Sequence, residues 1–112
     1  KKEVVIAECS AHWNDESDLS AQSYSFQHLT DPSTNAVFSD LECAESGTKS
    51  YIKGTVQNQV NIIRHIIEES VESGGMGVFT WGGDLYGNYK WGMFDSSGMA
   101  LKSIDVFSVM GK

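Results

Sequence analysis

The fold of this chain is decided by residues 55–83, TVQNQVNIIRHIIEESVESGGMGVFTWGG, in which a helical pattern passes directly into a strand pattern. In the first part, apolar residues recur at spacings of three and four, as on one face of an amphipathic helix. They are Val56, Val60, Ile63, Ile67 and Val71, with Ile62 and Ile66 widening the stripe, while Gln57, Asn61, Arg64, Glu68 and Glu72 fall outside it. We therefore expect a helix of about five turns.

Both ends of this helix carry residues typical of helix boundaries. Thr55 is placed to accept hydrogen bonds from the first free amides as an N-cap. Gly74 is placed to supply the left-handed residue that ends the helix. His65 lies beside Arg64 at the polar edge of the stripe, where a surface histidine is a simpler interpretation than a ligand.

Two short apolar runs flank the helix in the sequence. Residues 3–8, EVVIAE, and residues 75–83, GMGVFTWGG, do not alternate, which is typical of strands buried on both faces of a parallel sheet. A strand, a crossover containing a helix and a second strand give a parallel pair. The end of the chain, MALKSIDVFSVM, predicts a short helix with Leu101, Ile104 and Phe107 or Ser108 on one face.

Residues 9–54 show no sustained period, and we expect them to form one long loop. Compact domains seldom hold more than about 12–15 structureless residues in one connection unless the segment covers a site, binds a partner or is disordered. Within it, YSFQHL and NAVFSDL are candidates for a turn of helix or an edge strand.

This arrangement does not bury its own sheet, because two strands and two helices cannot cover both faces and both edges. The order strand, long loop, helix, strand, helix matches a slice of a (β/α)8 TIM barrel, which needs roughly 250 residues for its eight units. The predicted fold class is therefore α/β, a barrel fragment running from the seventh strand to the eighth helix. Residues 1–112 would be the C-terminal part of a barrel catalytic domain, within a longer protein or as one piece of a cut polypeptide.

The composition of the chain limits the classes of partner that it is expected to bind. The net charge of -7 disfavours nucleic acids and anionic membranes, because phosphates and acidic headgroups would be repelled. No apolar run approaches the roughly 18 residues that span a bilayer. The start, KKEVVIAEC, lacks the features of a signal peptide, so any secretion signal is expected outside these residues. Cys9 and Cys43 would form one disulfide in an oxidising compartment or stay as two thiols.

Chemistry-bearing side chains concentrate where the two predicted strands end, the face of a barrel that carries active sites. The first set is Glu8, His12, Trp13, Asp15, Glu16 and Asp18, and the second is Trp81, Asp84, Tyr86, Asn88, Tyr89 and Trp91. Exposed rings there suit the apolar faces of sugars. The alternative is that Trp81 and Trp91 are core residues that plug the barrel mouth, and for Trp91 the two interpretations are about equal. Glu8 is either a solvated strand end or one of the two carboxyl groups that glycoside cleavage needs.

The segments VVIAE, VQNQVNIIRHIIEE, GMGVFTW and KWGMFDSSGMALKSIDVF resemble the last two β/α units of the endo-β-1,4-galactanases of glycoside hydrolase family 53. The similarity covers residues 3–8 and about 55–108, and Gln59, which opens the helix, is among its more specific parts. The resemblance implies a secreted or cell-surface retaining enzyme that cleaves the β-1,4-galactan of pectic arabinogalactan and requires no cofactor. Its partners would be the polysaccharide or an oligosaccharide and the remainder of the barrel.

Residue roles follow from the same resemblance. Glu8 matches the family's nucleophile, and Trp81 matches the tryptophan that forms the floor of the sugar subsite. His12, Trp13 and Trp91 are further candidates for substrate binding. The family's acid/base glutamate belongs to strand four and has no counterpart here, so this chain alone should be inactive.

The chain departs from the family pattern in three places. CSAHW replaces the usual aromatic-proline pair after the nucleophile, and Thr80 and Gly82 flank the tryptophan of the eighth strand in place of Tyr and Glu. Bacterial members often bind calcium in the loop after strand seven, but NDESD lacks the spacing, so Asp15, Glu16 and Asp18 are either calcium ligands or a solvated acidic loop.

The alternative function is a non-catalytic carbohydrate-binding module, or a degenerate barrel, that stacks sugars on exposed tryptophans.

Overall fold

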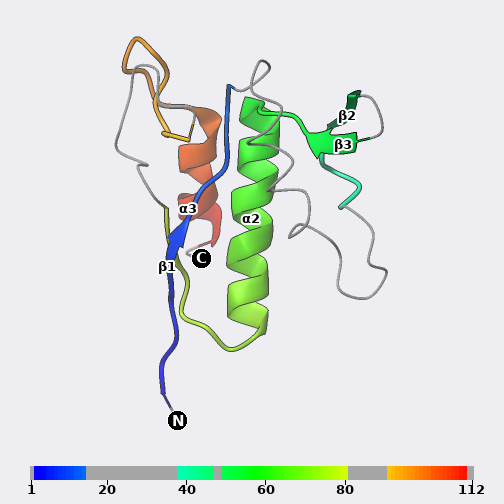
Figure 1. Ribbon diagram of the computed structural model, residues 1–112. Coiled ribbons are helices and arrows are strands. Elements are labelled where there is room, and N and C mark those ends of the chain that lie inside the picture. Colours follow the sequence, from blue (N-terminus) through cyan, green and yellow to red (C-terminus); the bar gives the residue numbers. More distant parts are fainter. Residues whose placement is uncertain (1, 15–37, 47–48, 81–90, 111–112) are drawn as a thin grey trace.

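The structure is a computed structural model that describes residues 2–14, 38–46, 49–80 and 91–110. Its elements are β1 (Ile6–Cys9), β2 (Cys43–Ser46), β3 (Lys49–Ile52), α2 (Val56–Glu72), β4 (Val78–Thr80), the 3-10 helix η1 (Lys102–Ile104) and α3 (Asp105–Met110). β1 and β4 pair in parallel, with α2 in the crossover between them (Figure 1). The predicted parallel pair and its connecting helix are therefore confirmed.

Both predicted ends of α2 are confirmed as well. The Thr55 hydroxyl accepts a hydrogen bond from the backbone N–H of Asn58 at 3.0 Å. Gly74 adopts a φ of 86°, the left-handed conformation in which a residue with a Cβ would be strained. Its backbone N–H donates to the carbonyl of Val71 at 3.0 Å, which satisfies one of the last free carbonyls of the helix.

The buried face of α2 differs from the predicted stripe at Val71, which is exposed, and at four polar residues that are buried, Asn58, Gln59, Asn61 and Ser70. Ile62, Ile63 and Ile67 are buried as predicted, and Ile63 is only 1% exposed. Val71 is 54% exposed, because it borders an open hollow at the C-terminal end of the helix. Asn61, predicted on the polar face, is buried, because its side-chain amide donates to the backbone carbonyl of Asp40 at 2.6 Å.

The prediction of one continuous loop over 9–54 is wrong for residues 43–52, which form an antiparallel hairpin. Its strands pair Cys43 with Ile52 and Ser46 with Lys49. The hairpin lies beside the N-terminal end of α2 (Figure 1), and the Ile52 side chain is buried in the core. Strands of four residues are too short for alternation to stand out in the sequence. Residues 15–37 lie outside the described part of the chain.

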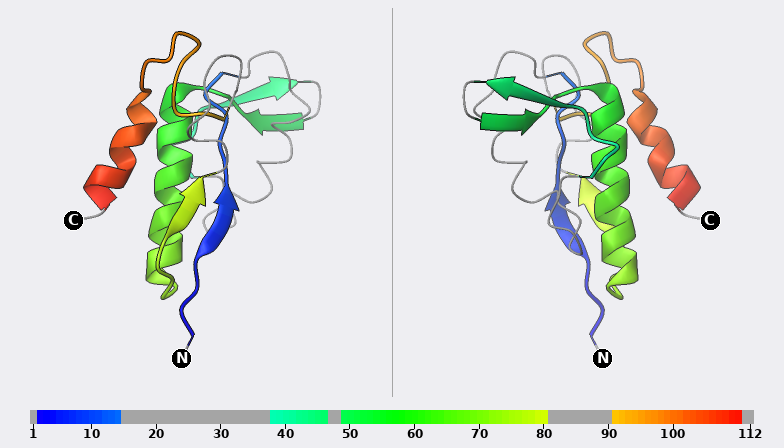
Figure 2. Two further views of the ribbon diagram at one scale, coloured as in Figure 1. Left: turned by 90° about the vertical axis from the view of Figure 1, so that its left-hand side faces the viewer. Right: turned by 90° about the vertical axis from the view of Figure 1, so that its right-hand side faces the viewer.

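The C-terminal helix begins later than predicted, and its inward face is only partly the predicted one, because Ile104 packs against the core as expected but other positions differ. Ser103 and Val106 are buried. Phe107 and Ser108, the two alternatives for the last residue of the predicted buried face, are exposed. The chain enters α3 through η1, and three residues per turn bring positions 103 and 106 onto one side. Figure 2 shows α3 against α2, with the β1–β4 pair on another side of that helix.

The core gathers around α2, and the β1–β4 pair is the part of the fold that is covered least. Buried core residues are Ala11, Leu41, Ile52, Ile62, Ile63, Ile67, Met93 and Val106. In contrast, Val4, Met76 and Phe79 on or beside the two strands are each more than half exposed. Among the described residues, none of the helices has the length and apolar character needed to cross a membrane.

Candidate functional site

The candidate site lies at the carboxyl end of the β1–β4 pair. Glu8 is the last residue but one of β1, and its side chain is exposed. Cys9, which follows it, pairs with Thr80, the last residue of β4, so both strands end side by side. The next residue of the chain is Trp81, which lies outside the described residues. Functional groups in parallel α/β folds are carried at this end of the strands.

The pairing of β1 with β4 is irregular in the stretch that contains Glu8. Val4 and Ile6 line a hollow together with Glu69 of α2, so strict alternation would place Glu8 on that side of the strand too. However, Ile6 pairs with Val78 and Cys9 with Thr80, so β1 uses one residue more than β4 over the same span. An extra residue breaks the alternation and re-aims a side chain. Glu8 lies within this irregular stretch, and its side chain is exposed.

The Cys9 thiol joins the two strand ends. It donates a weak hydrogen bond to the backbone carbonyl of Phe79 at 3.6 Å. Burial raises the pKa of this half-buried thiol above its ordinary value. Cys43 carries a separate thiol, exposed and 3.7 Å from the carbonyl of Leu41, so the structure contains the two-thiol alternative and not the disulfide.

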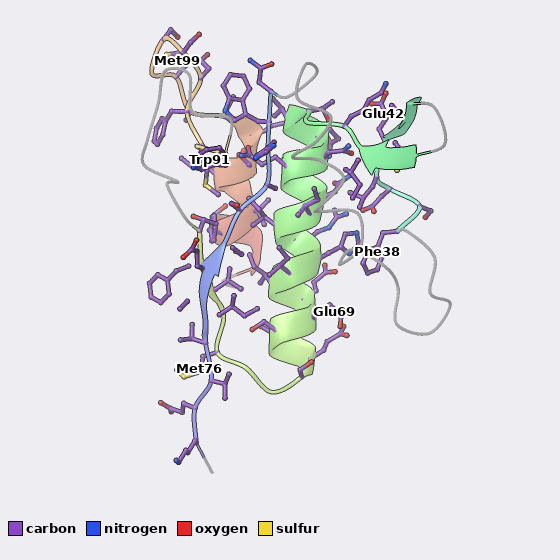
Figure 3. The ribbon with its side chains drawn as sticks, in the orientation of Figure 1. Phe38, Glu42, Glu69, Met76, Trp91 and Met99 are labelled. Carbon is purple, nitrogen blue, oxygen red and sulfur yellow. The ribbon has the colours of Figure 1, made fainter. Side chains whose placement is uncertain are left out.

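Two predicted substrate-binding residues meet above the sheet. The rings of His12, in the segment after β1, and Trp91 have centroids 5.5 Å apart and planes inclined by 33°. Trp91 lies beyond the end of β1, toward the N-terminal end of α2 (Figure 3). Both rings are half-buried, as is the neighbouring Trp13. The structure therefore brings His12 and Trp91 together, from segments almost eighty residues apart in the sequence.

Gln59, in the first turn of α2, contacts both segments that carry these rings. Its side-chain amide nitrogen donates to the backbone carbonyls of Ala11 at 3.0 Å and Gly92 at 2.9 Å. Its side-chain oxygen accepts a hydrogen bond of 2.6 Å from the hydroxyl of Ser103. Sequence reasoning noted Gln59 only within a resemblance and gave it no role in the site. Its spacing of three and four from Ile62 and Ile63, which places it on the buried face, was the available signal.

A second buried amide, Asn58, attaches the hairpin to the same turn of α2. Its side-chain nitrogen donates to the carbonyls of Glu42 at 2.7 Å and Lys53 at 2.8 Å. Its side-chain oxygen accepts from the backbone N–H of Glu42 at 2.9 Å. Adjacent amides thus hold different parts of the molecule: Asn58 holds the β2–β3 hairpin, and Gln59 holds the segments with the aromatic pair.

The chain after Trp91 folds back in a turn organised by Asp95. One oxygen of its carboxylate accepts hydrogen bonds from the Ser97 backbone N–H at 2.9 Å, the Ser97 hydroxyl at 2.7 Å and the Met99 N–H at 2.9 Å. These bonds, that from the Ser97 side chain above all, lower the pKa of Asp95. The turn brings Met93 beside Leu101, whose N–H donates to its carbonyl at 2.8 Å. These hydrogen bonds therefore hold residues 93–101, which follow Trp91, in a defined turn.

An acidic and basic cluster lies on the side of α2 away from Glu8. Asp40 accepts from Arg64 at 2.6 Å and contacts the His65 ring nitrogen at 2.8 Å, and the Phe38 ring stacks on His65 with centroids 3.8 Å apart. Partial burial tends to raise the pKa of Asp40, but the hydrogen bond from His65 and the charges of His65 and Arg64 outweigh it, so the pKa lies below its usual value. His65 thus contacts a carboxylate that also pairs with Arg64.

Several predicted positions cannot be placed in this geometry. Those outside the described residues are Asp15, Glu16, Asp18, Trp81, Asp84, Tyr86, Asn88 and Tyr89. In the part of the chain that is described, no group of three or more His, Cys, Asp or Glu side chains could hold a metal ion. The calcium candidates in 9–54 all belong to the first group and stay a prediction.

Comparisons with protein-family models, with curated proteins and with solved structures give no match for this chain.

Proposed function

We propose that this chain supplies the nucleophile and part of the sugar-binding surface of a retaining glycoside hydrolase that cleaves β-1,4-galactan. The observation that carries the proposal is the exposed Glu8 carboxylate near the carboxyl end of a parallel strand, with the His12–Trp91 pair beyond the end of that strand (Figure 3). The choice of galactan rests on the family resemblance of the sequence. Trp81 and Trp13 are the further sugar-binding positions in this proposal.

The chemistry requires Glu8 to act as a carboxylate. It attacks the anomeric carbon of the sugar while an acid protonates the departing glycosidic oxygen, and a covalent glycosyl ester forms. Water then attacks the same carbon, the acid's conjugate base takes the water proton, and the Glu8 carboxylate is released. In retaining enzymes the two carboxyl groups lie about 5–5.5 Å apart. The acid would come from the remainder of the barrel, so residues 1–112 alone are expected to be inactive.

The exposed apolar surface around the strands supports a barrel slice. Val5, Val71, Met76 and Phe79 line a hollow of about 500 Å³ together with Phe107 of α3, and all five are at least a third exposed. Parallel sheets occur almost only with both faces covered, so a two-stranded parallel pair is incomplete by itself. Neighbouring barrel strands and helices would bury this surface. With this assignment, the protein acts as a secreted or cell-surface enzyme, without a nucleic-acid or membrane partner.

The test replaces Glu8 by glutamine in the intact protein and measures the release of reducing ends from β-1,4-galactan. We expect the rate to fall by roughly a thousandfold or more, since the covalent step is lost, while galactan binding is retained. Glu3→Gln is the matched control, because Glu3 is also exposed but lies before the start of β1, away from the carboxyl end of the strand, and it should keep the wild-type rate. Retention of the rate by Glu8→Gln would remove Glu8 from the mechanism.

The alternative, a carbohydrate-binding module, is favoured by the same aromatic pair, since half-buried rings bind sugars in modules as well as in enzymes. It predicts that the wild-type protein binds galactan oligosaccharides without cleaving them. Calorimetric titration with the oligosaccharide, followed by chromatography of the recovered sugar, separates the two functions.

A further inference from the structure

We infer that Gln59 is a positioning residue that sets the spacing between His12 and Trp91, and thereby shapes the sugar-binding surface. The sugar part of this inference rests on the proposed function. The spacing part does not, because it follows from the contacts of Gln59 alone.

The geometric constraint comes from one nitrogen atom. Nε2 of Gln59 donates at 3.0 Å to the carbonyl of Ala11 and at 2.9 Å to the carbonyl of Gly92. Two oxygens bonded to one nitrogen at such distances cannot be more than roughly 6 Å apart. His12 directly follows Ala11, and Trp91 directly precedes Gly92. The amide therefore fixes the backbone on which each of the two rings is mounted.

The orientation of the amide is determined by chemistry. Backbone carbonyls only accept hydrogen bonds, so the two of them must face the NH2 group of Gln59. The side-chain oxygen then faces the Ser103 hydroxyl, which donates to it at 2.6 Å. Both amide protons and the oxygen are thus used, and a glutamate or an apolar residue at position 59 could not reproduce the pattern.

Burial makes these bonds difficult to replace. Gln59 is 0% exposed, and Ala11 and Gly92 are buried as well, so water does not readily take over the lost donor. A buried carbonyl left without a donor is unfavourable, and the segments would move to regain one. Asn58 provides the comparison: it is an equally buried amide in the adjacent position, but it binds the hairpin and neither ring-bearing segment.

The experiment compares two near-isosteric variants, Gln59→Met and Asn58→Leu, in the intact protein. Proton NMR with labelled histidine and tryptophan records the nuclear Overhauser effect between the His12 and Trp91 rings. Calorimetry with each variant in the Glu8→Gln background, which should bind without cleaving, gives the Kd for β-1,4-galactotetraose. We expect Gln59→Met to lose the ring contact and to weaken tetraose binding roughly ten- to a hundredfold. Asn58→Leu should lower the stability similarly but keep both the ring contact and the Kd within about threefold.

The possible outcomes are distinguishable. An unchanged ring contact in Gln59→Met, or an equal loss in Asn58→Leu, overturns the positioning role. A wild-type protein that shows the ring contact but binds no tetraose refutes the proposed function and leaves the role of Gln59 in spacing intact. If Gln59→Met does not fold, the wild-type protein decides: slow solvent exchange of both Gln59 side-chain amide protons supports the two loop bonds, and fast exchange overturns them.

Discussion

Replacing Asp40 by asparagine should destabilise the protein near neutral pH by removing the charge that holds the segment before the hairpin to α2. The Asp40 carboxylate contacts both Arg64 and His65, and the variant keeps the backbone carbonyl that binds Asn61. The substitution therefore removes the negative charge, but it keeps the size of the side chain and the backbone hydrogen bond to Asn61. Any change in stability then reports on the charge of Asp40.

The magnitude is modest because the pairs are partly open to solvent. The side chains of Asp40 and Arg64 are 33% and 40% exposed. Such pairs typically contribute about 0.2–1 kcal/mol each after screening by water and salt. With the Arg64 ion pair and the contact to the His65 ring lost together, the expected loss in the free energy of unfolding is about 1 kcal/mol at pH 6.

The pH dependence has a definite sign. The folded pKa of Asp40 lies below the value of about 4 that an unfolded aspartate has, so its stabilisation is fully present above pH 4. It is lost as the pH falls through the lower folded pKa, where the carboxyl is neutral in both states. The difference between wild type and Asp40→Asn should therefore shrink below pH 4.

Urea unfolding followed by the helical circular dichroism signal at pH 6 and at pH 2.5 measures both differences. Glu69→Gln is the control, because Glu69 is an exposed carboxylate on α2, the helix that Asp40 contacts. This variant should change the free energy of unfolding by less than about 0.5 kcal/mol. A loss in Asp40→Asn that is as large at pH 2.5 as at pH 6 would refute the ionic explanation.

The burial of individual side chains predicts the outcome of two substitutions and of one labelling experiment. Ile63→Ala should lower the free energy of unfolding by about 2–5 kcal/mol, because Ile63 is 1% exposed in the core, whereas Met99→Ala, at a 66% exposed turn position, should change it by less than about 0.5 kcal/mol. Similar urea midpoints for the two variants would place the core elsewhere. Iodoacetamide should alkylate Cys43 roughly tenfold faster than Cys9 at pH 8, since burial raises the pKa of Cys9 and Cys43 is exposed. Equal rates, measured by mass spectrometry of peptides, would contradict the half-buried position of Cys9.

The sequence predicted those parts of the fold whose signals are local. The period of Val60, Ile63 and Ile67, together with Thr55 and Gly74 at the ends, located α2 correctly. Such signals suffice because caps and periodicity act within a few residues. The parallel pairing of β1 with β4 also followed, since a helical crossover leaves few other connections.

Polar residues with distant partners could not be placed in this way. Asn58, Gln59 and Asn61 are buried because carbonyls from other segments accept their amide protons. The spacing from Ile62 and Ile63 places Gln59 on the buried face, but hydropathy counts amide side chains as solvent-facing, and only the tertiary structure supplies their acceptors. The hairpin was missed for a related reason, because Asn58 attaches strands that pair with each other and show no pattern of their own.

The surroundings of Glu8 show most clearly why a site is harder to predict than a fold. Its position near a strand end was predicted from the sequence. The irregular pairing between Ile6 and Cys9 was not, because β1 contains a residue there that has no counterpart on β4. This bulge arises from the pairing of two strands almost seventy residues apart, so no window of sequence around Glu8 contains it. Bulges are common next to active sites, and here only the tertiary structure reveals one.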